Sequence, residues 1–276
     1  MQLIQFPDGT LVPALGQGTW QLGQDPTKRT AELEALQVGI DLGLTLLDTA
    51  EMYADGEAER LVGEAIRGRR AQVFVVSKAY PQHASRQRLP QACEASLQRL
   101  GTDYLDLYLL HWRGRVPLAE TVEAMERLVA AGRIRRWGVS NLDTAAMQGL
   151  VAAGGGACAT DQVLYNLTRR GPEHDLLPWL AAHQMPVMAY SPVEQGRLLT
   201  NQSLQQVAAR LGVTPAQVAL AWVLHRDQVL TIPKAGQVAH ARENRAAADL
   251  ALSPLDLAEL DAAFPRPRQR QPLAML

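Results

Sequence analysis

Four residues that can take part in proton chemistry follow apolar stretches of the chain. Asp48 and Lys78 each come directly after a run of apolar or small residues, His111 follows a third run, and Tyr53 lies shortly after Asp48. A charge beside a buried strand is costly unless an opposite charge pairs with it, so we expect Asp48 and Lys78 to form an ion pair. A phenol has an ordinary pKa of about 10, and we expect the nearby Lys78 to lower the pKa of Tyr53 toward working pH.

These four side chains together suit the reduction of a carbonyl group. Tyr53 would protonate the developing alkoxide, Asp48 would hold the Lys78 ammonium in place, and His111 would orient the carbonyl oxygen or share the proton. Because no amino-acid side chain donates hydride, this reaction requires a cofactor. Each residue alone also suits a structural role, such as a turn cap for Asp48 or a solvent-directed lysine for Lys78. The combination of all four residues favours a catalytic site over four separate structural roles.

The elements that must position these residues alternate between strands and helices. Eight short runs of strand character are predicted at residues 15–19, 45–47, 73–77, 105–110, 137–139, 162–164, 187–189 and 229–232. Helical patterns between them include residues 30–43, 57–67, 86–100, 118–131 and 214–225. Alternation of this kind predicts an α/β fold with parallel strands, either an open doubly wound sheet or a closed barrel. The count of eight favours a (β/α)8 TIM barrel.

Two local patterns refine this fold prediction. Asp8-Gly9 between short apolar runs indicates an N-terminal β-hairpin. The glycine pattern of an open dinucleotide-binding fold is incomplete, because Gly16 and Gly18 are followed by Gln21 and by no immediate helix. No linker or repeat divides residues 1–276, so we expect a single domain.

In a barrel of this type, the C-terminal ends of the strands converge on one rim. The residues that follow the strand-like runs are unusually polar or aromatic: Trp20, Asp48, Lys78, His111, Ser140, Asn141, Gln162, Tyr190 and Lys234. We therefore expect these residues, distant in sequence, to surround one site.

Composition excludes several other classes of protein. The chain has 27 Lys and Arg residues against 28 Asp and Glu residues, so no strong net charge favours nucleic acid or an anionic membrane. Its two cysteines, Cys93 and Cys158, lack metal-ligand spacing and suit reduced thiols in a core. Six histidines form no zinc-binding pattern, so no metal site is expected. We expect a cytoplasmic protein without a membrane segment.

Five motifs in order resemble the aldo-keto reductase family. They are residues 48–53 (DTAEMY), 77–78 (SK), 109–112 (LLHW), 138–141 (GVSN) and 232–234 (IPK). The chain looks most like the small bacterial members that reduce methylglyoxal and related short carbonyls. The resemblance implies a barrel that binds an extended nicotinamide dinucleotide without a Rossmann domain, with Asp48, Tyr53, Lys78 and His111 as its catalytic tetrad.

The same resemblance implies which residues hold the cofactor. Ser140, Asn141 and Gln162 match the residues that bind the nicotinamide amide, Tyr190 matches the aromatic platform under the ring, and Ser191 follows it in the cofactor site. The family usually has Asn before this glutamine, whereas this chain has Asp161.

The resemblance also bears on the choice between NADPH and NADH. Lys234 matches the lysine that reads the 2′-phosphate of NADPH, but Ala235 and His240 replace the usual Ser and Arg. Glu243 and Asn244 match contacts to the adenine end. We therefore expect NADPH as cofactor, with a weaker preference that leaves room for NADH.

Substrate size and partners are further expectations. Trp20, Tyr80 and Trp112 should form aromatic walls close to Tyr53, although these rings could simply pack. Residues 265–272 look like a surface tail. Only about two dozen residues follow Ser253, and part of them has a helical pattern, so no long C-terminal loop for steroid-sized ligands is expected. We expect a monomer that binds a small carbonyl substrate.

Two other functions use the same residues. A Schiff-base aldolase would use Lys78 as a neutral amine nucleophile, but pairing with Asp48 keeps a lysine protonated. A cofactor-binding redox sensor would use the fold and the cofactor pocket without turnover. The complete tetrad favours the reductase.

Overall fold

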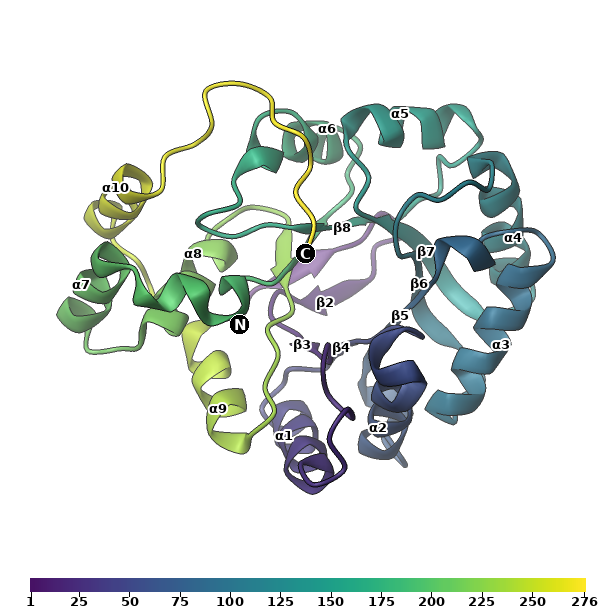
Figure 1. The fold of residues 1–276 in the computed structure, drawn as a ribbon, viewed down its shortest axis with the longest axis horizontal. Coiled ribbons are helices and arrows are strands. Elements are labelled where there is room, and N and C mark those ends of the chain that lie inside the picture. Colours follow the sequence, from purple (N-terminus) through teal and green to yellow (C-terminus); the bar gives the residue numbers. More distant parts are fainter.

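Eight parallel strands form the central sheet of the molecule (Figure 1). The computed structural model describes residues 1–276. The strands are β3 (Gln17–Gly18), β4 (Leu46–Asp48), β5 (Phe74–Ala79), β6 (Leu105–Leu110), β7 (Ile134–Ser140), β8 (Asp161–Leu164), β9 (Val187–Tyr190) and β10 (Val229–Thr231). Each strand pairs with the next in chain order. Parallel bridges from Leu15 to Thr231 and from Gly18 to Lys234 connect the first strand to the last. The predicted (β/α)8 TIM barrel is confirmed.

Ten α-helices surround this sheet. They are α1 (Arg29–Asp41), α2 (Glu57–Ala65), α3 (Arg88–Leu100), α4 (Leu118–Ala130), α5 (Thr144–Ala152), α6 (Leu176–Ala182), α7 (Gln202–Leu211), α8 (Pro215–Leu224), α9 (Val238–Ala247) and α10 (Pro254–Ala263). Local sequence sets their ends. At α8, for example, the Thr214 hydroxyl accepts from the Gln217 amide and Pro215 occupies the first turn, a favourable start for a helix.

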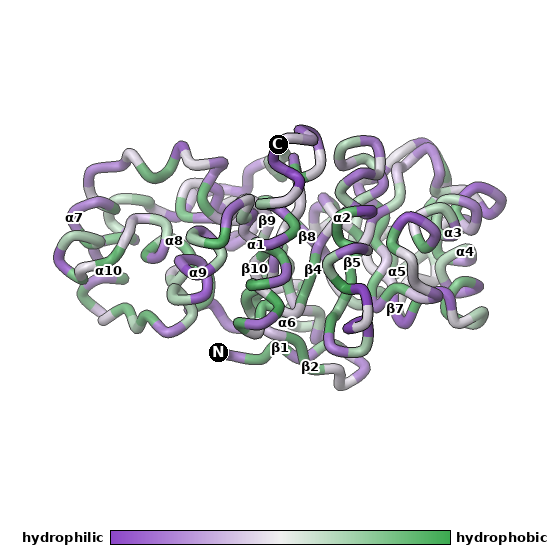
Figure 2. The backbone as a smooth tube through the Cα atoms, turned by 90° about the horizontal axis from the view of Figure 1, so that it is seen from below, coloured by the Kyte–Doolittle hydropathy of each residue, from purple (hydrophilic) through white to green (hydrophobic).

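The predicted hairpin closes one end of the barrel. It consists of β1 (Leu3–Gln5) and β2 (Leu11–Pro13), and Gly9 adopts a φ of +84° in the turn. The Phe6 ring stacks on Phe74 of β5 with ring centroids 5.5 Å apart. Figure 2 shows the hairpin at the bottom of the barrel and the C-terminus at the top. The hairpin therefore leaves the opposite end free for the site.

The expected surface tail, residues 265–272, is mostly exposed, and the chain beyond it reaches the cavity. After α10 the chain returns to the mouth of the barrel, where Met275 and Leu276 line the central cavity (Figure 1). Arg270 forms an ion pair with Asp175 at 3.0 Å. This segment thus runs along the rim and narrows the opening.

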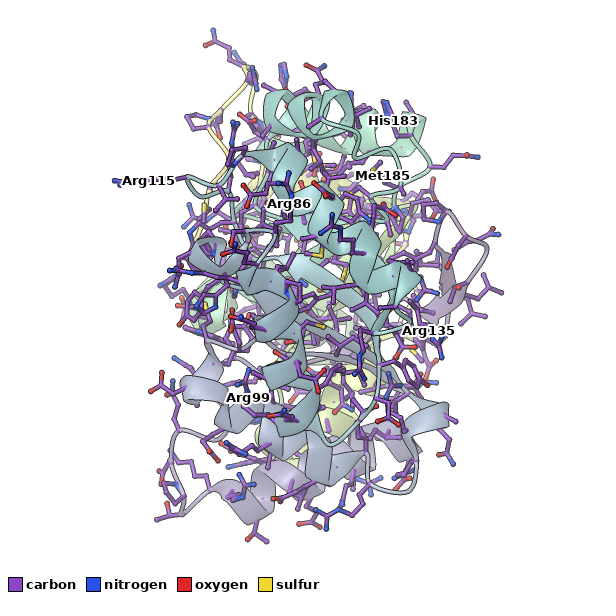
Figure 3. All side chains as sticks on the ribbon, turned by 90° about the vertical axis from the view of Figure 1, so that its right-hand side faces the viewer. Arg86, Arg99, Arg115, Arg135, His183 and Met185 are labelled. Atoms are coloured by element: carbon purple, nitrogen blue, oxygen red, sulfur yellow. The ribbon has the colours of Figure 1, made fainter.

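Charged side chains lie on the outside of the barrel. Arginines including Arg86, Arg99 and Arg135 are distributed over the side formed by the middle of the chain (Figure 3). Both cysteines are buried and unpaired, as expected. No single helix has the length and apolar character of a membrane span; α7 and α8 together meet those criteria, but they are bent by 92°.

Candidate active site

The predicted site residues surround one cavity at the C-terminal ends of the strands. Its volume is about 570 Å³. The expected residues that line it are Trp20, Asp48, Tyr53, His111, Trp112, Ser140, Asn141, Gln162, Tyr190, Ser191 and Lys234. Because every strand runs in the same direction, the residues that end the strands meet here although they are far apart in the sequence.

The ion pair between Asp48 and Lys78 is present. Lys78 lies at the end of β5, is fully buried, and donates to Asp48 Oδ2 at 2.7 Å. Its ammonium also donates to the Thr49 carbonyl oxygen at 2.9 Å and to the Tyr53 hydroxyl oxygen at 3.2 Å. Three acceptors match the three protons of an ammonium group. Asp48 in turn accepts from Gln162 Nε2 at 2.7 Å.

Burial opposes charge on both members of this pair. It raises the pKa of Asp48 and lowers the pKa of Lys78, while the attraction between the two charges acts in the opposite direction. The short contact and the further hydrogen bonds to each group are what a buried pair requires. The pair therefore fixes Lys78 beneath the Tyr53 hydroxyl.

The expected lowering of the Tyr53 pKa is wrong for this structure. Burial, followed by the Asp48 charge, raises the pKa of Tyr53 well above its ordinary value. Sequence reasoning considered only the Lys78 cation and neither of these two effects. Tyr53 is consequently a neutral phenol whose oxygen accepts from Lys78 and whose own proton remains available to the cavity.

His111 completes this group and is neutral. Burial, with a smaller contribution from the Lys78 charge, lowers the pKa of His111 to about 2. The imidazole meets the Tyr53 ring edge-on, with ring centroids 5.8 Å apart. Its Nδ1 atom is buried without a hydrogen-bond partner. A neutral imidazole can still hydrogen-bond a carbonyl oxygen, so its role does not need the charged form.

Asn141 connects three strands next to this group. It follows β7 with a left-handed φ of +62°, which asparagine tolerates better than most residues. Its amide nitrogen donates to the His111 carbonyl oxygen at 3.1 Å, and its amide oxygen accepts from the Tyr190 hydroxyl at 2.9 Å. Ser140 Oγ donates to the Gln162 carbonyl oxygen at 2.8 Å. The network holds these side chains at the cavity wall.

The residues at the other side of the cavity fit a nucleotide. Ser191 has a φ of +52°, and its hydroxyl is buried without a partner although the residue lines the cavity. A buried hydroxyl that has no partner within the protein can form a hydrogen bond with a ligand. Lys234 is exposed at the rim and donates to Gln21 Oε1 at 3.4 Å. A flat polar ligand with an anionic end matches this arrangement.

Five of the expected residues do not line this cavity, and one of them is the buried Lys78 described above. Tyr80 packs edge-on behind Trp112, with ring centroids 6.0 Å apart. On α9, His240 is exposed, Asn244 is buried, and Glu243 accepts from the Thr214 hydroxyl. The roles of the α9 residues toward the adenine end stay predictions.

Sequence reasoning missed other lining residues, including Gln21, Met52, Gln195, Met275 and Leu276. Met52 lies inside the DTAEMY motif and could have been included. The two C-terminal residues gave no local signal, because only the path of the chain brings them to the cavity. Neither the cavity nor any other region brings together three or more His, Cys, Asp or Glu side chains in a way that could hold a metal ion.

Comparison with known proteins identifies the class. The sequence pattern of the aldo/keto reductase family matches residues 14–264. The chain belongs to the aldo/keto reductase family, so it is an NAD(P)H-dependent oxidoreductase, and the resemblance seen in its motifs is confirmed.

Individual relatives agree with this assignment. The chain is 54% identical over 281 residues to methylglyoxal reductase YeaE of Escherichia coli (strain K12), covering 100% of this chain and 99% of that protein. It is 31% identical over 261 residues to glyoxal reductase of Bacillus subtilis (strain 168), covering 94% and 91%. An aldo/keto reductase of Klebsiella pneumoniae, solved in complex with NADP and acetate, superposes with a TM-score of 0.97 at 54% identity and 99% coverage of both chains.

Proposed function

We propose that this protein reduces methylglyoxal and other small aldehydes or ketones to alcohols with NADPH. The observation that carries the proposal is the group formed by Asp48, Lys78, Tyr53 and His111 at the wall of a cavity of about 570 Å³. The Escherichia coli relative named methylglyoxal reductase supports this substrate class, and the Klebsiella structure with NADP supports the cofactor.

Each residue of this group has a separate task. Bound NADPH supplies the hydride. Tyr53 transfers its proton to the carbonyl oxygen as negative charge develops there. Lys78, fixed by Asp48, stabilises the phenolate that remains, and the neutral His111 orients the carbonyl oxygen by a hydrogen bond. A raised Tyr53 pKa suits this direction of reaction, because the residue is protonated before the substrate arrives.

The other cavity residues would position the cofactor. Ser140, Asn141 and Gln162 would hold the nicotinamide amide, and Tyr190, whose hydroxyl is fixed on Asn141, would support the nicotinamide ring. Ser191 and Lys234 bind the phosphate-bearing part. On the helix α9, His240 would lie near the 2′-phosphate, and Glu243 and Asn244 would contact the adenine end.

Substrate size follows from the cavity walls. Trp20 and Trp112 narrow the opening, and Met275 and Leu276 cover part of it. NADPH oxidation measured with methylglyoxal, small aromatic aldehydes and a steroid tests this point. We expect the highest kcat/KM for the small carbonyls, and a steroid with a higher kcat/KM than methylglyoxal would contradict the proposal.

The aldolase alternative conflicts with the geometry of Lys78. A Schiff-base nucleophile must be a neutral amine with a free lone pair, whereas this ammonium is fully buried and has an acceptor for each proton. Borohydride trapping with a carbonyl substrate should give no adduct at Lys78. A redox sensor would bind NADPH without oxidising it in the presence of any carbonyl in the panel.

Assembly and location complete the proposal. Residues 1–276 act as one domain, and the protein is a cytoplasmic monomer without nucleic-acid or membrane partners. The two unpaired thiols suit a reducing compartment. Size-exclusion chromatography with light scattering, which should give the mass of one chain, tests the monomer.

A further inference from the structure

A buried glutamate outside the proposed tetrad contacts both a strand and a helix. Glu59 lies on α2 and is fully buried. Its Oε1 atom accepts from the Ser77 hydroxyl at 2.6 Å, and its Oε2 atom accepts at 2.5 Å from Nε of Arg99, which lies on α3 (Figure 3). Each carboxylate oxygen thus has its own donor, and one donor is a cation, as a buried carboxylate requires.

Ser77 connects this glutamate to the strand that carries Lys78. It is fully buried in β5 and directly precedes Lys78. Successive strand residues point to opposite faces of a sheet, so Ser77 points toward α2 while Lys78 points toward Tyr53. The hydrogen bond between Ser77 and Glu59 therefore holds this part of β5 against α2.

Arg99 connects the same glutamate to the turn that carries Tyr53. This turn, η1 (Tyr53–Gly56), ends directly before α2. A Cβ atom at Gly56 would lie 2.5 Å from Arg99 Cδ, so the arginine side chain packs directly against the turn. Ala54 and Gly56 have φ angles of +50° and +89°, and alanine rarely adopts such an angle. A strained turn keeps its shape only where neighbouring groups enforce it.

We propose that Glu59 is a positioning residue for proton transfer, because it joins the strand that carries Lys78 to the turn that carries Tyr53. Ser77 is its contact to the strand, and Arg99 is its contact to the turn. The inference rests on the proposed function, in which Tyr53 protonates the carbonyl oxygen. The Lys78 ammonium and the Tyr53 hydroxyl are 3.2 Å apart, and displacement of either group would weaken the stabilisation of the phenolate.

The first test is Glu59→Gln, which keeps the size of the side chain and removes its charge. A glutamine has one acceptor oxygen, so its amide nitrogen, itself a donor, must face either Ser77 or Arg99. We expect kcat/KM for methylglyoxal to fall about tenfold to a hundredfold. The NADPH Kd, measured by fluorescence, should stay within about twofold of the wild-type value, because Glu59 and its two partners do not line the cavity.

Two further measurements separate positioning from a structural role. In Glu59→Gln the ratio of kcat in H2O to kcat in D2O should rise, because proton transfer limits turnover more strongly. The matched control is Glu173→Gln, since the largely buried Glu173 pairs with the buried Arg170 at 2.8 Å. It should lose stability, while its kcat/KM and its isotope ratio stay close to the wild-type values.

The second test repeats Glu59→Gln in a Tyr53→Phe background. A residue that acts by positioning the phenol has nothing to position in this background. Its further effect on kcat/KM should therefore be less than about twofold. General damage to the fold would instead lower kcat/KM by the same factor in both backgrounds.

Ser77→Ala tests the contact to the strand with a smaller change. It removes one hydroxyl group and leaves the ion pair between Glu59 and Arg99 in place, so it serves even if Glu59→Gln does not fold. We expect kcat/KM to fall about two- to tenfold, the effect of roughly one hydrogen bond. The NADPH Kd should again stay close to the wild-type value.

Two results would overturn the inference. One is a kcat/KM close to the wild-type value in folded Glu59→Gln or, if that variant does not fold, in Ser77→Ala. The other is an equal loss of kcat/KM from Glu59→Gln in the wild-type and the Tyr53→Phe backgrounds. Both results concern differences between variants. They are distinct from failure of the proposed function, which would appear as a wild-type protein that binds NADPH without reducing a carbonyl.

Discussion

At the N-terminal end of the barrel, the hairpin packs Ile4, Phe6 and Val12 against apolar strand residues. At the C-terminal end, the same strands bury Asp48 and Lys78 and lead into polar side chains. Burial stabilises the first end directly, whereas at the second it shifts pKa values and leaves polar atoms without partners. One end of the barrel thus contributes stability, and the other contributes chemistry.

Backbone conformation differs between the hairpin turn and the mouth of the barrel. The hairpin turn uses Gly9, for which a positive φ carries no steric penalty. At the mouth, non-glycine residues including Gln21, Asn141, Ser191 and Gln195 adopt positive φ angles. Strain of this kind persists only where the surrounding structure enforces it, and it is concentrated at functional sites. This difference predicts that substitutions at the two ends have separable effects.

The largest effect is expected for Tyr53→Phe. Removal of the proposed proton donor should lower kcat/KM for methylglyoxal about a hundredfold to ten thousandfold, while the NADPH Kd stays close to the wild-type value. Steady-state kinetics and NADPH fluorescence measure the two quantities separately. Tyr104→Phe is a matched control, because Tyr104 packs under Arg70 away from the cavity. Near-wild-type turnover of Tyr53→Phe would remove Tyr53 from its proposed role.

Phe6→Ala should have an effect of comparable size, but on the free energy of unfolding rather than on kcat/KM. Phe6 is buried against Phe74, and truncation of a buried phenylalanine costs about 3–5 kcal/mol in the free energy of unfolding. Denaturant unfolding measures this loss, and kcat/KM of the folded variant should change little. Leu3→Ala, in the same hairpin but at an exposed residue, should cost less than about 0.5 kcal/mol. A large loss of kcat/KM in folded Phe6→Ala would show that the two ends are coupled.

The sequence predicted those structural features of the two ends that depend on local sequence pattern. Each strand was expected within a few residues, because apolar runs of suitable length are bounded by helices with clear starts. The first strand is shorter than the predicted residues 15–19, since only Gln17–Gly18 pair with β4. Leu15 instead pairs across the closing seam, at Thr231 of β10. Convergence of Asp48, Lys78 and His111 followed from the rule that parallel strands end on one rim.

The features that the sequence did not predict depend on contacts between residues that are far apart in the sequence. The direction of the Tyr53 pKa depends on how completely the cavity wall excludes water, which is a property of the whole fold. The return of Met275 and Leu276 to the mouth depends on contacts such as the pair between Arg270 and Asp175. Asp161 was noticed as a departure from the family pattern, but the sequence did not show that neither of its carboxyl oxygens has a hydrogen-bond partner.

The free energy of unfolding of Asp161→Asn gives a further test of the comparison between the two ends of the barrel. The folded protein raises the Asp161 pKa above its unfolded value of about 3.9. Above that pH the unfolded chain releases a proton that the folded chain keeps, so stability falls as pH rises until Asp161 ionises in the folded state. Asp161→Asn does not lose stability in this way. The difference in the free energy of unfolding between Asp161→Asn and the wild type should therefore grow by about 1.4 kcal/mol per pH unit, from the unfolded pKa up to the pH at which Asp161 ionises in the folded state.

Unfolding by denaturant at several pH values measures this difference. Asp103→Asn, at an exposed residue, is the control and should follow the wild type throughout. A constant difference between Asp161→Asn and the wild type across pH would show that Asp161 is already ionised in the folded protein.

The smallest effect is expected at the outer edge of the mouth, for His240→Arg. His240 is exposed on α9, so solvent screens its interaction with the 2′-phosphate of NADPH. Arginine carries a permanent charge on a planar group that pairs well with phosphate, so it should bind the 2′-phosphate better than histidine does. In His240→Arg the ratio of kcat/KM for NADPH over NADH should be about two- to threefold higher than in the wild type. His183→Arg, at an exposed histidine beside α6, controls for added charge. An unchanged ratio in His240→Arg would place His240 outside the cofactor site and leave Lys234 as the phosphate contact.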